Sequence, residues 1–132
     1  MARILYTVCG VGLGHCMRSM PLIEELEKNG HEILLSSYST AFEFLKKKFE
    51  NSKSIQLFDI LEGSDNEKLL KIVVYEVSIE PNSLGKNFLR LLKEVKKFRP
   101  QIIISDFDLY SSIIGFLLDI PVVLISNMHI SE

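Results

Sequence analysis

Short apolar runs alternate along this chain with longer amphipathic segments. The runs are apolar at successive positions, which is typical of strands covered on both faces. They predict strands over residues 3–8, 31–36, 54–60, 101–105 and 122–126. In the segments between them, apolar residues recur at helical spacing. This spacing predicts helices over residues 15–29, 40–49, 81–98 and 109–118.

Strands that alternate with helices in this way predict βαβ units with right-handed crossovers. We therefore expect an α/β fold, a Rossmann-like, doubly wound parallel sheet in three α/β/α layers. At 132 residues the chain is expected to form a single domain, residues 1–132.

Two stretches depart from the regular pattern. Pro21 falls inside the first predicted helix, so either the helix begins near Ser19, with Pro21 in its first turn, or it begins at His15 and is kinked. Residues 61–80 show little periodicity. Within them, residues 72–77 have strong β propensity, which favours a strand or an extended segment.

Composition narrows the classes of protein to consider. The chain is 47% hydrophobic and 24% charged, as in an ordinary globular protein, and its formal net charge of −2 argues against a nucleic-acid binder. Its first apolar run is too short for a signal peptide. The longest apolar stretch, residues 113–125, is broken by Asp119 and Pro121 and is too short to span a membrane. We therefore expect a cytoplasmic protein.

Ligands of doubly wound sheets bind beyond the carboxyl ends of the strands, where the first and fourth strands diverge. Two loops meet that description here. The loop CGVGLGHC over residues 9–16 contains Gly10, Gly12 and Gly14, and the other loop, residues 106–108, contains Phe107. Glycines allow the backbone to approach a ligand closely, and the following helix N-terminus supplies N–H donors.

The glycine loop does not match the known cofactor motifs. A dinucleotide fingerprint requires a third glycine where this sequence has His15 or Met17, and no acidic residue ends the second strand. No GK[ST] follows, so the loop is not a P-loop. Cys9 and Cys16 form neither a CxxC pair nor half of a zinc site, and we expect two reduced thiols. The sequence thus predicts no cofactor and no metal.

His15 and Asp106 are the candidate catalytic residues. His15 directly follows Gly14 at the mouth of the first βα turn, where a neutral imidazole can accept a proton from a substrate hydroxyl. Asp106 ends the fourth strand and could orient that imidazole. Each also has a structural alternative. His15 could be a polar residue of the helix N-terminus, and Asp106 could cap the next helix, a position for which Asp108 competes.

Several segments together resemble the N-terminal signature of GT-B glycosyltransferases. They are residues 12–15 (GLGH), 21–26 (PLIEEL), 29–33 (NGHEI), 99–107 (RPQIIISDF) and 120–123 (IPVV). The most similar branch contains the N-acetylglucosaminyltransferase of peptidoglycan precursor synthesis and related archaeal and bacterial transferases. The resemblance covers nearly the whole chain except about residues 60–82.

This resemblance implies two Rossmann-like domains that face a cleft and an inverting transfer of sugar from a nucleotide donor. The N-terminal domain of the family binds the acceptor and holds the base. Its loop histidine corresponds to His15, its loop glycines to Gly12 and Gly14, and the aspartate that orients the histidine in some relatives to Asp106.

Other positions follow from the same resemblance. His31 corresponds to a structural residue that opens the second strand. Asn127 and His129 lie after the last strand, where relatives carry a polar loop near the cleft. With Gly10 and Phe107, they complete the residues that we expect to contact substrate.

The chain departs from the family in length, because relatives are more than twice as long and their donor site lies in a C-terminal domain absent here. We therefore expect an acceptor-binding half that is inactive alone: a fragment, a remnant or a subunit of a split enzyme. Its partners would be a donor-binding domain or subunit and a sugar or lipid-linked acceptor. The alternative is a non-enzymatic module that binds phosphate or nucleotide at residues 10–15. Convergence of His15 and Asp106 would favour the transferase.

Two surfaces suggest further contacts. Lys93, Lys96, Lys97 and Arg99, with residues 46–48, form basic clusters that could meet an anionic membrane or simply be solvated helix faces. Because a GT-B N-terminal domain normally continues into further strands and helices, we also expect uncovered apolar surface and self-association of the isolated chain.

Overall fold

The computed structural model describes residues 1–61 and 81–125. The extended segment predicted over residues 72–77 lies outside this part, as do Asn127 and His129. The described strands are β1 (Arg3–Val8), β2 (Glu32–Ser37), β3 (Ile55–Asp59), β4 (Ile102–Asp106) and β5 (Val122–Ile125). The described helices are α1 (Gly14–Lys28), α2 (Ser39–Lys48), α4 (Pro81–Phe98) and α5 (Leu109–Leu118).

The described strands form one parallel sheet in the order β3-β2-β1-β4-β5. The chain builds outwards from β1 through β2 to β3, then returns to the other side of β1 with β4 and β5. In this register Val8 at the end of β1 lies opposite Asp106 at the end of β4. The switch point between the first and fourth strands is therefore where the sequence predicted it.

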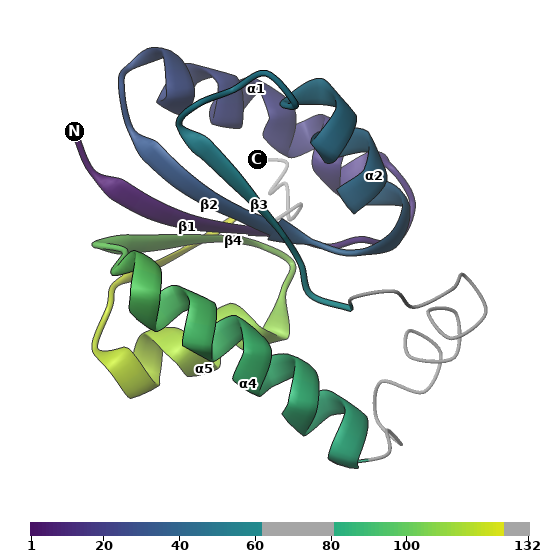
Figure 1. Ribbon diagram of the computed structural model, residues 1–132, viewed down its shortest axis with the longest axis vertical. Helices are drawn as coiled ribbons and strands as arrows, with labels where there is room; N and C mark the ends of the chain where they lie inside the picture. Colours follow the sequence, from purple (N-terminus) through teal and green to yellow (C-terminus); the bar gives the residue numbers. More distant parts are fainter. Residues whose placement is uncertain (62–80, 126–132) are drawn as a thin grey trace, which may run out of the picture.

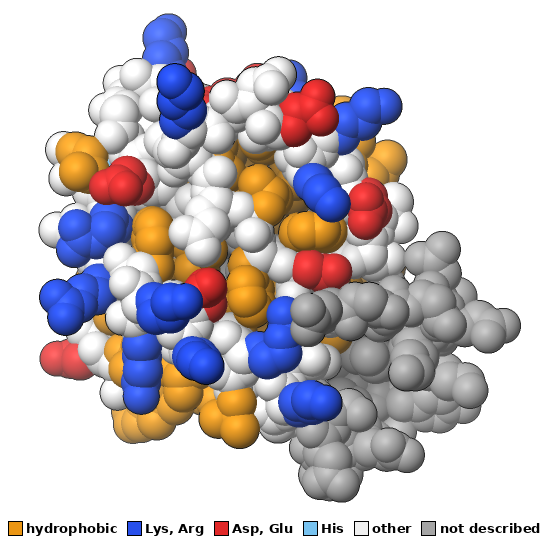
Figure 2. Space-filling view, in the orientation of Figure 1, with side chains coloured by type: hydrophobic (Ala, Val, Ile, Leu, Met, Phe, Trp, Pro, Cys, Tyr) orange, Lys and Arg blue, Asp and Glu red, His pale blue; other side chains and the backbone are white. Residues whose placement is uncertain are grey.

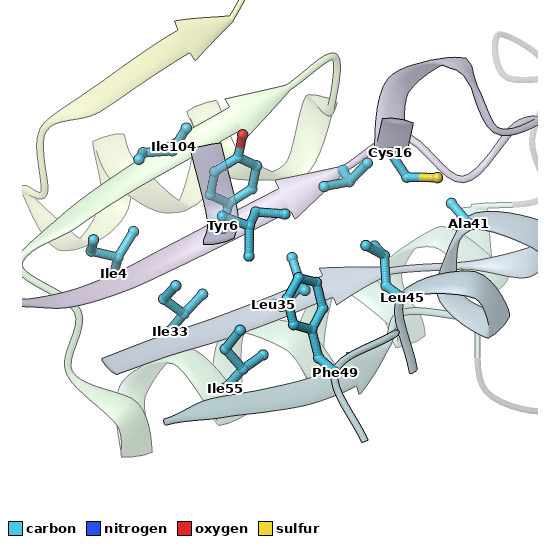
Figure 3. Close-up of a cluster of buried hydrophobic side chains, with 12 residues drawn as sticks. Ile4, Tyr6, Cys16, Ile33, Leu35, Ala41, Leu45, Phe49, Ile55 and Ile104 are labelled. Carbon is cyan, nitrogen blue, oxygen red and sulfur yellow. The ribbon is translucent and has the colours of Figure 1, made fainter. Parts of the chain in front are cut away.

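Two pairs of helices enclose the sheet, with α1 and α2 on one face and α4 and α5 on the other (Figure 1). Each face has its own buried core. Figure 3 shows the first, in which Tyr6 and Leu35 from the sheet meet Cys16 of α1 and Leu45 of α2. The second core joins Leu5 and other sheet residues to α4 and α5. These layers confirm the three-layer α/β/α prediction.

Helix α1 begins at Gly14 and contains Pro21, so the helix does not begin near Ser19. Proline has no N–H with which to bond the carbonyl of Met17, one turn earlier. Both residues are exposed, so water can solvate that carbonyl. Just after the helix, His31 Nδ1 accepts a 3.0 Å hydrogen bond from the backbone N–H of Ala2. His31 thus ties the start of β2 to the chain N-terminus, which agrees with its expected structural role.

The surface of the described ranges carries the basic groups that the sequence predicted. Basic side chains gather along the solvent-facing side of α4 (Figure 2). Leu89 of the same helix is an exposed leucine. Three more lysines, residues 46–48, end α2, where cations interact favourably with the helix dipole. Within the described ranges, no helix combines the length and apolarity that crossing a membrane requires.

A second surface is apolar and lies on α5, where Figure 2 shows hydrophobic side chains at the lower left of the view. We call this surface, together with Leu124 of the neighbouring strand β5, the α5/β5 patch; its exposed members on α5 are Ile113, Phe116 and Leu117. Phe116 is 86% exposed. Clusters of large exposed apolar side chains mark surfaces that associate with other molecules.

We predict that the chain self-associates through this patch. Light scattering over a range of concentrations should show a mass that rises with concentration, and Phe116→Lys should abolish the rise because it places a charge at the most exposed apolar position. Leu89→Lys is the matched control, because Leu89 is an exposed leucine on α4, outside the patch. A constant monomer mass for the unmodified chain would contradict this prediction.

Candidate functional site

The loop between β1 and α1 is shaped by a close approach of Gly10 to Tyr38, the residue that precedes α2. A Cβ atom at Gly10 would lie 2.1 Å from the Tyr38 carbonyl oxygen and 2.5 Å from its ring. Only glycine fits there, so Gly10 is required for packing as well as being a candidate binding residue. Gly12 adopts φ +68°, in the region that favours glycine, and a Cβ atom added at Gly12 or Gly14 would meet nothing within 4 Å. The loop is thus open where it enters α1.

The first turns of α1 direct three polar side chains toward the end of β4. His15, Arg18 and Ser19 are spaced three and four residues apart, so they lie on one face of the helix. Asp106 lies on the sheet face that α1 covers, because it is two residues beyond Ile104, a member of that core. Its side chain is fully buried.

His15 and Asp106 converge, as the sequence analysis anticipated. Nδ1 of His15 lies 2.9 Å from Oδ1 of Asp106, although the residues are 91 positions apart in the chain. The imidazole is one-quarter exposed. Among the contacts of the described residues, the hydrogen bonds of the ring all involve Nδ1.

Asp108, not Asp106, caps helix α5. The Asp108 carboxylate accepts hydrogen bonds from the backbone N–H of Ser111 at 3.0 Å and from its hydroxyl at 2.5 Å. Ser111 also lies 2.5 Å from Thr7 Oγ1 on the α5 side of the sheet. The capping alternative for Asp106 is therefore wrong, and its carboxylate is available to His15.

Sequence reasoning missed Arg18 and Ser19. Arg18 contacts both carboxylate oxygens of Asp106, and the Ser19 hydroxyl donates to Oδ2. Nη2 of Arg18 also lies 3.2 Å from His15 Nδ1. The signal that could have found them is their helical spacing from His15, which places all three on the face toward the sheet.

Phe107 packs against the histidine from the other loop. Its ring stacks on the His15 imidazole with centroids 5.3 Å apart and planes 17° apart. Its backbone adopts φ +58°, an unusual conformation for a bulky residue, and its side chain is 73% exposed. The exposed ring of Phe107 thus lies beside His15, and its contact with a bound substrate stays a prediction.

The groups around Asp106 differ in charge. Burial raises the pKa of the Tyr6 hydroxyl to about 12, and it also raises the pKa of the Cys16 thiol. Both groups consequently stay neutral near pH 7, and Arg18 supplies the positive charge beside the carboxylate. Across the loop, burial raises the pKa of Tyr38, whose hydroxyl lies 3.6 Å from Cys9 Sγ.

Cys9 and Cys16 are both buried and form no disulfide. In the part of the chain that the structure describes, no three His, Cys, Asp or Glu side chains form a group that could hold a metal ion. The ionisable groups that meet at this site are the imidazole of His15, the carboxylate of Asp106 and the guanidinium of Arg18. Such a set can take a proton from a substrate hydroxyl and stabilise the resulting imidazolium.

Comparison with curated proteins relates the chain to archaeal transferases. It is 31% identical over 134 residues to an uncharacterized glycosyltransferase of Methanosarcina mazei, with 98% of this chain and 34% of that protein covered. It is 30% identical over 130 residues to one of Methanosarcina acetivorans, again covering 98% of this chain and 34% of the relative. The chain thus spans about a third of the length of these relatives.

Solved structures share the fold at lower sequence identity. The Acinetobacter baumannii MurG structure superposes with a TM-score of 0.66 at 17% identity, covering 94% of this chain and 34% of that one. The spinosyn rhamnosyltransferase SpnG gives 0.63 at 21%, covering 92% and 34%. A UDP-GlcNAc 2-epimerase from Methanocaldococcus jannaschii gives 0.58 at 16%, covering 92% and 31%. The fold therefore occurs in proteins with different activities.

A family model matches nearly the whole chain. The model describes glycosyl transferase family 1 and aligns with residues 2–132. Together with the archaeal relatives and the parallel sheet shared with GT-B transferases, this match assigns the family. The chain belongs to glycosyl transferase family 1.

Proposed function

We propose that this chain is the acceptor-binding half of a glycosyltransferase that transfers a sugar from a nucleotide-sugar donor, with His15 as the general base. The observation that carries the proposal is the 2.9 Å contact between His15 Nδ1 and the buried Asp106. This pair lies at the carboxyl ends of β1 and β4, where doubly wound sheets bind their ligands. Family membership supplies the reaction class.

In the proposed reaction, Nε2 of His15 takes the proton from an acceptor hydroxyl. The acceptor oxygen forms a bond to the anomeric carbon of the donor sugar from the opposite side to the leaving group. The bond from that carbon to the diphosphate oxygen breaks, and the nucleoside diphosphate leaves with the electron pair. Asp106 orients the ring and stabilises the imidazolium that forms.

We infer that the donor site is supplied by another domain or subunit. The chain corresponds to about a third of its archaeal relatives, and the family resemblance implies that the N-terminal domain binds the acceptor. By itself the chain would bind a sugar or lipid-linked acceptor and catalyse no transfer. Asn127 and His129, outside the described residues, remain predicted acceptor contacts.

The alternative, a non-enzymatic module that binds phosphate or nucleotide, draws on the same loop. The space around Gly12 and Gly14 and the N–H groups of the first turn of α1 would suit an anion. That function gives no reason for a histidine bonded to a buried aspartate. The His15–Asp106 contact therefore favours the transferase.

We predict that His15→Ala lowers sugar transfer about 100-fold, because the acceptor hydroxyl loses its general base. The measurement is release of nucleoside diphosphate from a panel of nucleotide sugars, with lipid extracts and simple glycosides as acceptors. The chain would be assayed alone and after mixing with the part of the Methanosarcina mazei relative that lies outside the region matched by this chain, which is tested as the donor-binding half. We expect release only in the mixture.

His31→Gln is the matched control, because His31 is a histidine outside the site that contacts the backbone of Ala2. Its transfer rate should equal that of the unmodified chain. An unchanged rate for His15→Ala would remove His15 as the base. Tight binding of a nucleotide by the chain alone, unaffected by Asp106→Asn, would favour the binding module instead.

A further inference from the structure

One guanidinium contacts both members of the His15–Asp106 pair. Nη2 of Arg18 contacts Asp106 Oδ1, and Nε lies 3.4 Å from Oδ2. The planar fork of arginine matches the two oxygens of a carboxylate, and such paired contacts fix the orientation of both groups. The same Nη2 lies 3.2 Å from His15 Nδ1.

These contacts determine whether Nδ1 of His15 carries a hydrogen atom. Nδ1 of His15 cannot both donate to Asp106 and accept from Arg18. The distance to the carboxylate is 2.9 Å and the distance to the guanidinium is 3.2 Å. An ionised carboxylate is also the stronger partner for a ring N–H. Two donors that share one carboxylate oxygen lie near each other without a bond between them, which accounts for the 3.2 Å separation.

The carboxylate of Asp106 has a full set of partners on the α1 side. Oδ1 faces His15 and Nη2 of Arg18, and Oδ2 faces Nε of Arg18 and the Ser19 hydroxyl. The terminal torsion of an aspartate side chain is broad and weakly restrained by itself. Arg18 is the partner that contacts both oxygens, so it restrains that torsion most strongly.

We propose that Arg18 is a positioning residue that holds the Asp106 carboxylate in the orientation that selects the Nδ1–H tautomer of His15. In that tautomer Nε2 carries no hydrogen and can accept a proton from a substrate. This inference rests on the proposed function only where it assigns Nε2 the role of accepting a proton from the substrate. Arg18 acts through Asp106 and need not touch the substrate.

The tautomer can be measured in the chain by itself, without any activity. Nitrogen-15 NMR of the ring nitrogens, with His15→Gln used to assign the signals, distinguishes Nδ1–H from Nε2–H. We expect the Nδ1–H tautomer in the unmodified chain at a pH where the ring is neutral. In Arg18→Gln we expect a mixture of the two tautomers, because the carboxylate can turn away from the ring.

Kinetics in the reconstituted enzyme provide a second readout. Arg18→Gln should lower kcat about 10-fold with KM changed less than twofold, because a misplaced base slows the chemical step and leaves acceptor binding intact. Arg18→Lys should rescue little of the loss, since an ammonium cannot contact both oxygens as a planar fork does.

Arg90→Gln is the matched control for removing an arginine. Arg90 donates to the backbone carbonyls of Asp59 and Ile60 and lies over the Phe58 ring, so its loss affects stability and not the histidine. A shift of the His15 signals in Arg90→Gln as large as that in Arg18→Gln would overturn the specific role of Arg18.

The NMR result separates this inference from the proposed function. If the unmodified chain shows Nε2–H, or if Arg18→Gln leaves the tautomer unchanged, the positioning role is wrong whatever the transfer rate. If the tautomer responds as expected and no donor sugar is ever transferred, the positioning role stands and the transferase proposal fails. Should Arg18→Gln fail to fold, the tautomer of the unmodified chain and Arg18→Lys still decide the question.

Discussion

Asp106→Asn is expected to lower the free energy of unfolding by about 3 kcal/mol and the rate of sugar transfer by about 100-fold. The carboxylate is fully buried and accepts hydrogen bonds from His15, Arg18 and Ser19. An amide cannot present acceptors on both sides, so one of its N–H donors must face Arg18. Removing one member of a buried charge pair leaves the other uncompensated, and the partial exposure of Arg18 limits the loss to the lower end of the usual range.

Urea unfolding followed by circular dichroism measures the stability, and the reconstituted assay measures the rate. Asp108→Asn is the matched control two residues away, because asparagine caps a helix about as well as aspartate. Its stability should change by less than about 1 kcal/mol and its rate should be unaffected. Equal changes in unfolding free energy and transfer rate for the two variants would contradict the role given to Asp106.

Gly10→Ala is expected to destabilise the fold by about 3 kcal/mol, at the upper end of what overpacking usually costs. The added methyl would lie 2.1 Å from the Tyr38 carbonyl oxygen, and this contact is with backbone, which cannot simply rotate away. Either the β1–α1 loop or the start of α2 must shift. Thermal unfolding should show a midpoint lowered by roughly 10 °C for a chain of this size.

Gly14→Ala is the control for this prediction, measured for stability alone. Nothing lies within 4 Å of a Cβ built at Gly14, and the residue is the first of α1, where alanine is the better helix former. Its unfolding midpoint should stay the same or rise slightly. A Gly10→Ala midpoint equal to that of Gly14→Ala would show that the loop can relax at no cost.

Much of the architecture could be predicted from periodicity alone. Continuous apolar runs such as residues 101–105 indicate strands that are buried on both faces. When such strands alternate with helices, they predict a parallel sheet. The convergence of His15 and Asp106 followed from the same topology, because both lie at the carboxyl edge of adjacent strands. The strand order of doubly wound sheets thus predicts contact between two residues that lie 91 positions apart in the sequence.

The parts that escaped prediction depend on side-chain geometry. The sequence leaves open whether Asp106 or Asp108 caps α5, because the choice depends on which face of the chain each carboxylate occupies. Arg18 was overlooked because arginine on an exposed helix usually reaches solvent, whereas here it reaches back to a buried acid. The left-handed backbone of Phe107 has no signature in composition or spacing.

The pairing of β1 with β4 also bears on how the protein folds. The strands β1, β2 and β3 come from the first half of the described chain, whereas β4 follows only after α4. Joining β4 to β1 closes a loop of about 90 residues. Because closing so long a loop costs conformational entropy, we expect this pairing to form late in folding, after contacts within each half of the sheet. The histidine and its aspartate therefore meet only when the two halves of the sheet have come together. A nascent chain would carry no formed site until β4 has been synthesised and docked.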